Sequence, residues 1–448
     1  MYNGNMDTFE KFYFINTYGC QMNIHESEKI AGVLEKLGYF PCDAENKADV
    51  LVYNTCCIRE TAEAKIHGHI GEAKILKQNN PDLIVVVCGC MSQQSGVATS
   101  LKRRFPFVDV VLGTSNLDLL EQAVVDAKQK KKTVNTDEKN YVLVNLPKVR
   151  TSRPNAWVNI IYGCNNFRTY CIVPYVRGRE HSRPIQDIVS EVKDLIAKGY
   201  KEITLLGQNV NSYGHDLDDG TNFAQLLNEV AKIDGDFRVR FLTNHPKDLT
   251  DDVIQAIANN KKICNSIHLP VQSGSSDILK AMNRKYDRDY YLQLVEKIKK
   301  AIPDVGISTD IMVGFPGETE QDFLDTLDLV KKARFSSAFC FIYSRRKGTV
   351  ADKMDNQISR AEKGVRIKRL LEAQNVITKE ISQEMEGTLQ RVLIEGKNKK
   401  YVNTYCGRTE NGRLVNVKSD VDLFDQFVWV KIKKFQSATL WGELQKED

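Results

Sequence analysis

The segment Val158–Glu180 reads VNIIYGCNNFRTYCIVPYVRGRE and joins a strand-like run to a cysteine-containing loop. Cys164 and Cys171 lie seven positions apart in this loop, and Arg168 stands between them. Two thiolates at this spacing are typical of part of a metal site, but a site in a protein usually takes more than two ligands. The chemistry of the loop therefore depends on what the residue at position 168 contributes.

Length and composition limit the kind of protein. A chain of 448 residues is too long for one compact core and predicts two or three domains. No apolar run approaches the length of a membrane span, and the first residues lack the pattern of a signal peptide, so we expect a cytoplasmic protein. Its 11 cysteines are then expected to serve as metal ligands, catalytic groups or buried side chains rather than as disulfides. The net charge of +5 permits nucleic-acid binding without demonstrating it.

The pattern of strands and helices predicts an α/β protein with three regions. Residues 1–150 alternate buried β-branched runs with helical periodicity, which is typical of a parallel α/β domain. Residues 151–384 repeat this pattern and predict a partial or complete (β/α) barrel that ends in a long helix. Residues 385–448 change to short strands, which indicate a small antiparallel β-barrel. The lysine-rich stretch from Lys128 to Lys132 begins the expected linker between the first two regions.

The long helix is expected to bury one face. Its apolar side chains recur at roughly helical spacing, as a face packed on a core requires. These side chains are Ile367, Leu370, Leu371, Ile377 and Ile381.

Three cysteines come directly after strand-like runs of the first region: Cys20, Cys56 and Cys90. Because the carboxyl ends of neighbouring parallel strands share one edge of a sheet, these thiols are expected to converge. Three thiolates around one point suit a 4Fe–4S cluster with one iron left open. Zinc is an alternative, but a structural zinc site usually takes a fourth protein ligand. The cysteines elsewhere are expected to be ordinary buried side chains, namely Cys42, Cys57, Cys88, Cys264, Cys340 and Cys406.

Several motifs together resemble the methylthiotransferase branch of the radical S-adenosylmethionine enzymes, over nearly the whole chain. The stretches TYGCQMN, YNTCCIRE and GCMSQQ resemble the amino-terminal cluster motifs of that branch. HLPVQSGSS and DIMVGFPGETEQDF resemble its barrel segments, and the last region, with GRTENGRLVNV, resembles a TRAM domain, an RNA-binding module. The loop NIIYGCNNF followed by YCIVPYVRGRE is most similar to members that add a methylthio group to C2 of N6-isopentenyladenosine in tRNA.

This resemblance implies two 4Fe–4S clusters and S-adenosylmethionine as cofactors. The first cluster, which supplies or carries the sulfur, is implied on Cys20, Cys56 and Cys90. The second is implied in the barrel loop, where it cleaves S-adenosylmethionine to a 5′-deoxyadenosyl radical. Tyr170, just before Cys171, matches the aromatic position that packs near the adenine of the cofactor. The strand ends GQNVNSY and VGFPGE are candidates for further cofactor contacts, or are ordinary turns.

The resemblance also implies tRNA as a partner, besides an electron donor and a sulfur donor that the sequence does not identify. Bases are expected to stack on an aromatic side chain such as Tyr401 or Tyr405. The basic residues expected to contact the RNA are Arg408, Arg413, Lys431 and Lys433.

Arg168 departs from the pattern of the family. In this loop the family has three cysteines, CxxxCxxC, and Arg168 stands at the second ligand position. Arginine stays protonated and has no acceptor pair for iron. A point mutation or sequence error, a natural impaired copy, or a substitute ligand would each explain it. The intact motif around one changed residue favours the first explanation.

We therefore predict the activity of the family for the lineage and impaired activity for this chain. One alternative is a catalytically inactive iron–sulfur and tRNA-binding protein. Another is a methylthiotransferase that acts on a different tRNA base or on a ribosomal protein.

Overall fold

The structure is a computed structural model that describes residues 10–57, 60–139, 146–436 and 438–445, without the side chains of residues 60–64. Its contacts divide the chain into two compact units. The N-terminal unit comprises Met1–Thr151, Tyr162–Asn165 and Ile172–His181. The C-terminal unit comprises Ser152–Ile161, Asn166–Cys171 and Ser182–Asp448. The chain therefore passes between the units several times around the cysteine loop.

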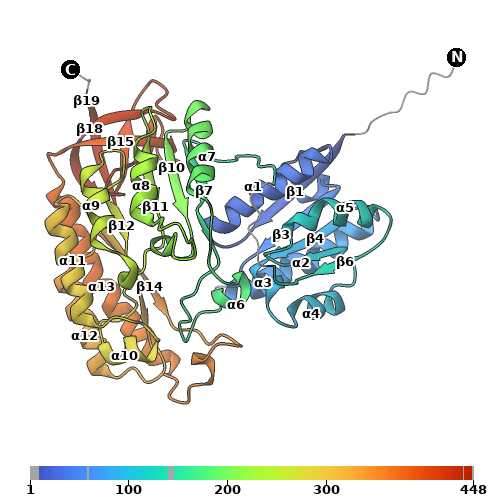
Figure 1. The fold of residues 1–448 in the computed structure, drawn as a ribbon, viewed down its shortest axis with the longest axis horizontal. Coiled ribbons are helices and arrows are strands. Elements are labelled where there is room, and N and C mark those ends of the chain that lie inside the picture. Colours follow the sequence, from blue (N-terminus) through green and yellow to red (C-terminus); the bar gives the residue numbers. More distant parts are fainter. Residues whose placement is uncertain (1–9, 58–59, 140–145, 437, 446–448) are drawn as a thin grey trace. The chain divides into compact units, whose positions relative to one another are not determined.

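A six-stranded parallel sheet forms the N-terminal unit, in the order β2-β1-β3-β4-β5-β6 (Figure 1). Its strands are β1 (Lys11–Thr17), β2 (Tyr39–Pro41), β3 (Val50–Thr55), β4 (Ile84–Gly89), β5 (Val110–Leu112) and β6 (Thr133–Asn135). Its helices are α1 (Gln21–Lys36), α2 (Glu60–Asn79), α3 (Cys90–Gln93), α4 (Val97–Arg104), α5 (Leu120–Lys128) and α6 (Val173–Arg177). Two turns of 3₁₀ helix add η1 (Glu45–Lys47) and η2 (Leu117–Leu119). The parallel α/β domain predicted from the sequence is confirmed.

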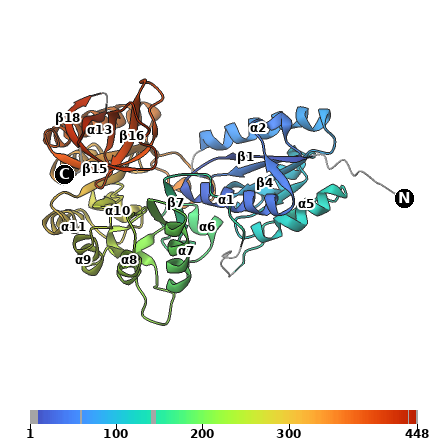
Figure 2. The ribbon, with the colours of Figure 1, turned by 90° about the horizontal axis from the view of Figure 1, so that it is seen from above.

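Both faces of this sheet are covered by helices (Figure 2). On β3, Val50 and Val52 pack into the core that includes residues of α1 and α5. Leu51 and Tyr53 point the other way, into the core that includes residues of α2 and α4. A strand buried on both faces carries apolar residues at successive positions, which is why these strands appear as continuous apolar runs in the sequence.

The prediction that a linker begins at Lys128–Lys132 is wrong, because these residues belong to the N-terminal unit. Lys128 ends α5, and the residues that follow make the turn into β6, which pairs with β5. A strand of three residues is too short to give a periodic signal, so the sequence pattern did not reveal it.

The C-terminal unit begins with six parallel strands. They form two sheets, β7-β10-β11 and β12-β13-β14, and an isolated bridge from Val239 to Ile263 continues from β11 toward β12. The strands are β7 (Asn155–Asn159), β10 (Glu202–Leu206), β11 (Arg238–Phe241), β12 (Ser266–His268), β13 (Gly306–Val313) and β14 (Ser337–Ile342). Their order in space follows their order in the chain, as in a partial (β/α) barrel.

Helices alternate with these strands and share their core. They are α7 (Ile185–Ala197), α8 (Phe223–Ala231), α9 (Asp251–Asn259), α10 (Ser276–Ala281), α11 (Arg288–Ala301), α12 (Glu320–Ala333) and α13 (Arg360–Glu384). Short 3₁₀ helices are η3 (Val210–Ser212), η4 (Pro246–Asp248) and η5 (Ala351–Lys353). Two short strands, β8 (Ile161–Tyr162) and β9 (His181–Ser182), lie where the chain passes from one unit to the other. None of the helices in the described ranges is both long and apolar enough to cross a lipid bilayer.

The long helix α13 buries Leu370 and Ile377, and Ile367 and Ile381 pack beside them. The prediction for Leu371 is wrong, because this side chain is 41% exposed. One step along a helix turns the side chain by about 100°, so Leu371 points away from the face that Leu370 shares with the core.

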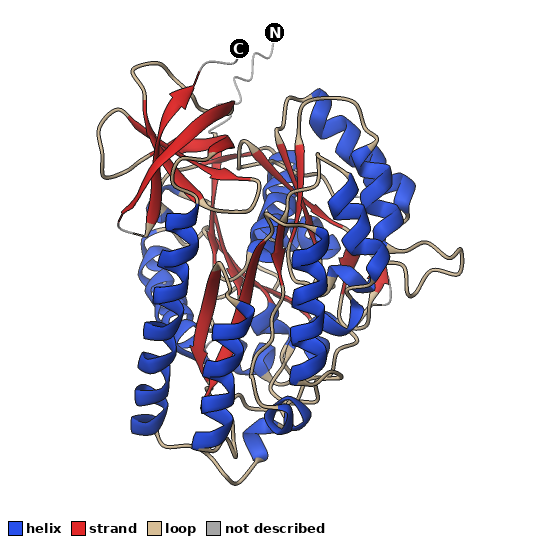
Figure 3. Cartoon of the chain, turned by 90° about the vertical axis from the view of Figure 1, so that its left-hand side faces the viewer, coloured by secondary structure: helices blue, strands red, loops and turns tan. Residues whose placement is uncertain are grey.

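Near its C-terminus the chain forms a β-barrel (Figure 3). The barrel is closed and has five strands, in the order β15-β16-β17-β19-β18. Its strands are β15 (Leu389–Lys397), β16 (Thr404–Thr409), β17 (Leu414–Lys418), β18 (Phe427–Gln436) and β19 (Thr439–Gln445). The barrel predicted for this region is confirmed. Its pairings are antiparallel except that of β17 with β19, which is parallel.

Candidate iron–sulfur sites

The three strand-end cysteines lie at one edge of the N-terminal sheet. Cys20 precedes α1, Cys56 follows β3 directly, and Cys90 opens α3 after β4. Since β1, β3 and β4 are neighbours and run parallel, these residues share the carboxyl edge of the sheet. The structure thus brings together the loops that the sequence pattern selected.

Two glycines let these loops approach closely. A Cβ added to Gly19 would lie 2.6 Å from Cβ and 3.0 Å from Sγ of Cys56, and one added to Gly89 would lie 2.4 Å from the carbonyl oxygen of Thr55. Both glycines also have positive φ, +121° and +97°, which side chains disfavour. Glycine at both positions therefore permits the convergence of the thiols.

Polar side chains from α1 and α6 surround the thiols. Asn23 donates to the carbonyl oxygen of Thr55 at 2.9 Å, and its Oδ1 lies 3.6 Å from Sγ of Cys20. Arg177 donates to Oε1 of Glu26 at 2.7 Å and to Oδ1 of Asn23 at 3.3 Å. The sequence pattern had not singled out Arg177, Glu26 or Asn23, because nothing in the spacing of these residues marks them as neighbours.

The neighbouring cysteines differ from one another in their surroundings. Cys88 packs in the core that the sheet forms with α1 and α5, and burial raises the pKa of its thiol. Cys57 packs against Cys90 together with Ile172 and Val176. A hydrogen bond from Cys57 and the charge of Arg177 lower the pKa of the Cys90 thiol to about 7, against the effect of burial.

Three thiols at one sheet edge match the ligands of a 4Fe–4S cluster that leaves one iron open. Within the described ranges, no three His, Cys, Asp or Glu side chains gather in the way that one metal ion requires. A four-iron cluster is larger than one ion, so its thiolates stand farther apart and are supplied by separate loops. A buried cation beside the thiols also suits a group that carries several thiolates.

The loop from Val158 to Glu180 has a different character. Cys164 is buried, and its backbone N–H donates to the carbonyl oxygen of Gly178 at 3.1 Å. In the segment Asn166–Cys171, the N–H of Cys171 donates to the carbonyl oxygen of Arg168 at 3.0 Å, which makes a tight turn. Nη2 of Arg168 lies 3.5 Å from Sγ of Cys171. A guanidinium thus stands beside the thiol and offers no electron pair to iron. The residues present do not fit a three-thiolate cluster here.

The charge of Arg168 also reaches into the barrel. Burial, Arg284 and Arg168 together lower the pKa of His245 to about 2. Tyr170 accepts a hydrogen bond from Arg284 at 2.8 Å, and its ring meets that of Phe315 edge-on, 6.4 Å between centroids. The hydroxyl of Tyr170 is therefore engaged within the C-terminal unit. Neither Arg284 nor His245 was marked by a motif or a spacing in the sequence.

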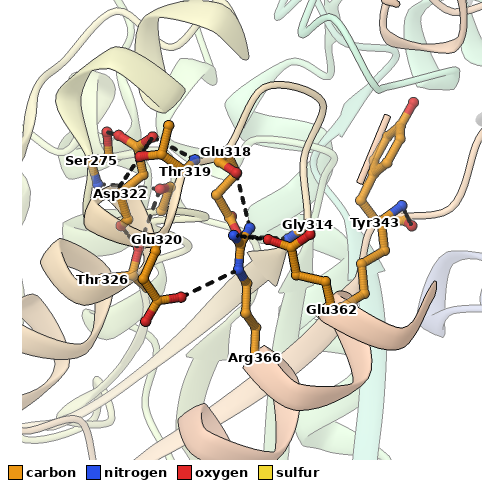
Figure 4. A network of polar contacts seen from close by, with 12 residues as sticks. Ser275, Gly314, Glu318, Thr319, Glu320, Asp322, Thr326, Tyr343, Glu362 and Arg366 are labelled. Carbon is orange, nitrogen blue, oxygen red and sulfur yellow. Dashed lines mark hydrogen bonds and ion pairs between the residues drawn. The ribbon is translucent and has the colours of Figure 1, made fainter. Parts of the chain in front are cut away.

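The two candidate strand ends are held by their own hydrogen bonds. Figure 4 shows the VGFPGE turn, where Glu318 accepts from the N–H of Gly314 at 2.9 Å and from Arg366 at 2.7 Å. Glu318 and Arg366 are each 2% exposed. In the GQNVNSY turn, Asn209 donates to Asp248 at 2.7 Å. These contacts support the reading of both segments as structural turns.

The four basic residues predicted to contact RNA differ in their surroundings. Arg413 is largely buried and donates to the carbonyl oxygen of Ser336 at 2.6 Å and to the hydroxyl of Ser382. Arg408 pairs with Glu395 at 3.3 Å, and Lys433 pairs with Glu443 at 2.9 Å. Lys431 is exposed on β18. Three of the four side chains thus already contact protein groups, and Lys431 is the one most open to a ligand.

Of the two aromatic candidates in this barrel, Tyr405 was chosen wrongly. Its side chain is 5% exposed and packs in the barrel core, so no base can stack on it. Tyr401 is 46% exposed, and its ring meets Trp441 edge-on at 5.0 Å. Successive side chains of a strand point to opposite faces of the sheet. Which face of β16 is turned into the barrel depends on the strand register, which is not visible in the sequence.

Comparison with known proteins places these sites in a family. The chain is 53% identical over 433 residues to the tRNA-2-methylthio-N(6)-dimethylallyladenosine synthase of Clostridium botulinum, which covers 96% of each chain. The enzyme of the same name from Clostridium perfringens is 51% identical and covers 98% of each chain. This chain belongs to the tRNA-2-methylthio-N(6)-dimethylallyladenosine synthase family. The methylthiotransferase resemblance drawn from the motifs is confirmed.

Models of three families match parts of the chain. Uncharacterized protein family UPF0004 matches residues 12–113, the radical SAM superfamily matches residues 158–330, and the TRAM domain matches residues 383–444. The radical SAM match implies a 4Fe–4S cluster and S-adenosylmethionine for the family. Arg168 therefore stands in a loop whose family relies on a cluster.

Solved structures support the fold alone. The radical S-adenosylmethionine methyltransferase TsrM from Kitasatospora setae aligns with a TM-score of 0.57 at 13% identity, over 77% of each chain. OxsB, a cobalamin-dependent S-adenosylmethionine radical enzyme, aligns with a TM-score of 0.52 at 13% identity, over 81% of this chain and 56% of the other. At such low identity the likeness shows the arrangement of strands and helices but not the chemistry.

Proposed function

We propose that this lineage adds a methylthio group to C2 of N6-isopentenyladenosine in tRNA, by radical S-adenosylmethionine chemistry. The observation that supports this most directly is the 53% identity over 96% of the chain to a synthase named for that product. Identity of this extent covers both units and the C-terminal barrel rather than one shared module. An adenosine base in tRNA is therefore the proposed substrate, with a cytoplasmic location as a prediction that follows from that substrate.

Cys20, Cys56 and Cys90 are proposed to hold the first 4Fe–4S cluster. When bound, such a cluster offers one iron at which sulfur is held for transfer. The chain itself supplies the thiolates from three loops, and Asn23 fixes two of these loops by its contacts with Cys20 and Thr55. This arrangement places the thiols at the edge of a rigid sheet, which fixes their spacing.

The cysteine loop of this chain is proposed to be impaired. Cys164 and Cys171 remain as candidate ligands of a second cluster, while Arg168 supplies a cation 3.5 Å from Sγ of Cys171. Because a guanidinium cannot take the place of a thiolate, we derive no reaction step from this loop as it stands. Tyr170 keeps its proposed place near the adenine of S-adenosylmethionine.

The C-terminal barrel is proposed to bind the tRNA. Lys431 and Tyr401 are the exposed basic and aromatic side chains that support this role, with the half-exposed Arg408 and Lys433 close to carboxylates. Arg413 contributes by holding the barrel against α13 through Ser382 rather than by meeting the RNA itself. The electron donor and the sulfur donor are further partners that the lineage requires.

Restoring the third thiol tests this proposal. The Arg168→Cys variant should gain a second cluster and form 5′-deoxyadenosine from S-adenosylmethionine under anaerobic, reducing conditions. With three thiols at each site, iron should rise from roughly four to roughly eight atoms per chain after reconstitution. The unmodified chain should form little or no 5′-deoxyadenosine.

Arg168→Ala is the matched control, because it removes the cation without adding a thiolate. It should leave iron and 5′-deoxyadenosine at the level of the unmodified chain. If the unmodified chain already cleaves the cofactor at the rate of the cysteine variant, another ligand completes the cluster and the impairment proposed for Arg168 is wrong.

A non-catalytic role is the second candidate for this exact chain. The contact between Arg168 and Cys171 favours it, since a chain with only the first cluster still binds iron and tRNA. If the Arg168→Cys variant gains a cluster and methylthiolates isopentenylated tRNA, the lineage is catalytic. If it modifies only another tRNA base or a ribosomal protein, the substrate proposed here is wrong.

A further inference from the structure

A buried guanidinium lies beside the three strand-end cysteines. The side chains of Arg177 and Glu26 are each 6% exposed, and Nη1 of Arg177 donates to Glu26 at 2.7 Å. Nη2 donates to Asn23 at 3.3 Å, and the positive charge of the guanidinium acts on the thiol of Cys90. Asn23 in turn contacts Sγ of Cys20 at 3.6 Å. Arg177 therefore acts on two of the three thiols, on Cys90 through its charge and on Cys20 through Asn23.

The backbone that carries Arg177 is fixed within the N-terminal unit. Val176 and Ile172 pack against Cys57 and Cys90 in one small apolar cluster. The hydroxyl of Thr114 donates to the carbonyl oxygen of Val176 at 2.5 Å. The residue before Arg177 is held by packing and by a hydrogen bond, and the guanidinium is held by its own hydrogen bonds. The side chain of Arg177 therefore has little freedom to turn away from the thiols.

The charges around the thiols do not cancel without this cation. Three thiolates and the carboxylate of Glu26 are negative, and Arg177 is a buried cation that donates to Glu26 and whose charge acts on Cys90. Buried charges interact strongly because little water screens them. Net charge and hydrogen bonds to the ligand sulfurs are among the factors that set the reduction potential of an iron–sulfur cluster.

We infer that Arg177 is a positioning residue of the first cluster site, which holds the Cys20 and Cys90 loops and favours the reduced cluster by its charge. This inference rests on the proposed function, because it takes the cluster on Cys20, Cys56 and Cys90 as bound. Removing the cation should shift the potential of the cluster to more negative values. Removing the carboxylate of Glu26, which offsets the cation, should shift it to more positive values.

A purely structural salt bridge would give a different pattern. Breaking a buried pair destabilises the fold whichever partner is lost, so both single variants would then lower stability without opposite effects on the cluster. The sign of the potential shift therefore separates an electrostatic role from a role in packing alone. Arg177→Lys adds a second criterion, since lysine keeps the charge but loses the planar fork.

The experiment is a redox titration of the reconstituted full-length chain, followed by electron paramagnetic resonance of the reduced cluster. The variants are Arg177→Gln, Arg177→Lys and Glu26→Gln. Arg103→Gln on α4 is the control, because Arg103 is exposed and belongs to the same unit. Iron per chain is measured for each protein, so that loss of the cluster is not mistaken for a shift.

We expect a more negative potential for Arg177→Gln, a value near that of the parent for Arg177→Lys, and a more positive one for Glu26→Gln. Equal reduction potentials for Arg177→Gln and Arg103→Gln would overturn the inference. It would also be overturned if Arg177→Lys and Arg177→Gln shifted the potential by the same amount. If Arg177→Gln fails to retain iron, the sign found for Glu26→Gln decides. A parent chain without any cluster would instead refute the proposed first site.

Discussion

Glu202 joins the partial barrel to the C-terminal barrel through two arginines, and its replacement makes a quantitative test. Its Oε2 accepts from Nε of Arg238 at 2.6 Å and from Nε of Arg240 at 2.7 Å. The same guanidinium groups donate to carbonyl oxygens of the C-terminal barrel, at 2.8 Å from Arg238 to Arg408 and at 3.2 Å from Arg240 to Glu410. Glu202→Gln keeps the shape but removes the carboxylate that pairs with both arginines.

The expected cost follows from burial. Glu202 is 5% exposed and Arg238 is 1% exposed, so the variant leaves buried cations without their carboxylate. Breaking a buried pair in this way costs about 3–5 kcal/mol. At about 1.4 kcal/mol for each factor of ten, the equilibrium for opening this part of the unit should shift by roughly a hundredfold or more.

Hydrogen exchange of β15 and β16 measures that opening in the intact chain. Exchange in these strands should accelerate strongly in Glu202→Gln, while the N-terminal sheet keeps its protection. Glu229→Gln is the control, because the pair of Glu229 with Lys232 is exposed on both sides and is expected to contribute less than about 1 kcal/mol. Equal exchange in the two variants would refute the assignment of Glu202 as the link.

The same carboxylate predicts a pH dependence. Burial favours the neutral acid, but Arg240 and Arg238 outweigh it and lower the pKa of Glu202 below its ordinary value of 4.5. A lowered pKa stabilises the fold above the unfolded value, and this contribution is lost as the pH falls through the folded value. Protection of β15 and β16 should therefore fall in acid for the parent and depend less on pH for Glu202→Gln.

Two further predictions concern iron and RNA. Alanine at each strand-end cysteine should remove roughly one cluster's iron, whereas Cys88→Ala should retain it; iron loss from Cys57→Ala in place of Cys56→Ala would reassign the ligand. Lys431→Glu should weaken tRNA binding and reduce its salt dependence, since each phosphate contact contributes roughly one unit of the salt slope. A chain ending at Glu386 that binds tRNA as well as the full chain would contradict the role proposed for the C-terminal barrel.

The sequence predicted the shared sheet edge of the three strand-end cysteines because local signals sufficed there. A cysteine that directly follows a buried strand is placed at a sheet edge by the topology of any parallel α/β domain, so Cys20, Cys56 and Cys90 needed no contact information. Arg168 was singled out in the same way, because arginine stands where the resemblance to the family implies a cysteine. The residue types that can bind iron and the ends of buried strands can both be identified from the sequence alone.

Contacts between distant charges were not predictable. Glu202 and Arg238 are register partners on the neighbouring strands β10 and β11, and the register that brings them together is not visible in the sequence. Helix α1 shows the same limit, because Asn23 and Glu26 occupy buried positions that hydrophobic periodicity treats as exposed. These two side chains are buried because Arg177, which is more than 150 positions away in the sequence, donates hydrogen bonds to both of them.

The division of the cysteine loop between the units bears on how the chain is made and inherited. Tyr162 accepts from the buried Lys29 of α1 at 2.6 Å, and Arg177 donates to Glu26 of α1. The contacts of α1 can therefore form only after residues 162 and 177 have been synthesised. The N-terminal unit cannot be completed on the ribosome until residue 181 has emerged, when β7 has already been made. For the same reason, a single recombination point at residue 151 would separate α1 from its partners, so that the two units are expected to be inherited as a pair.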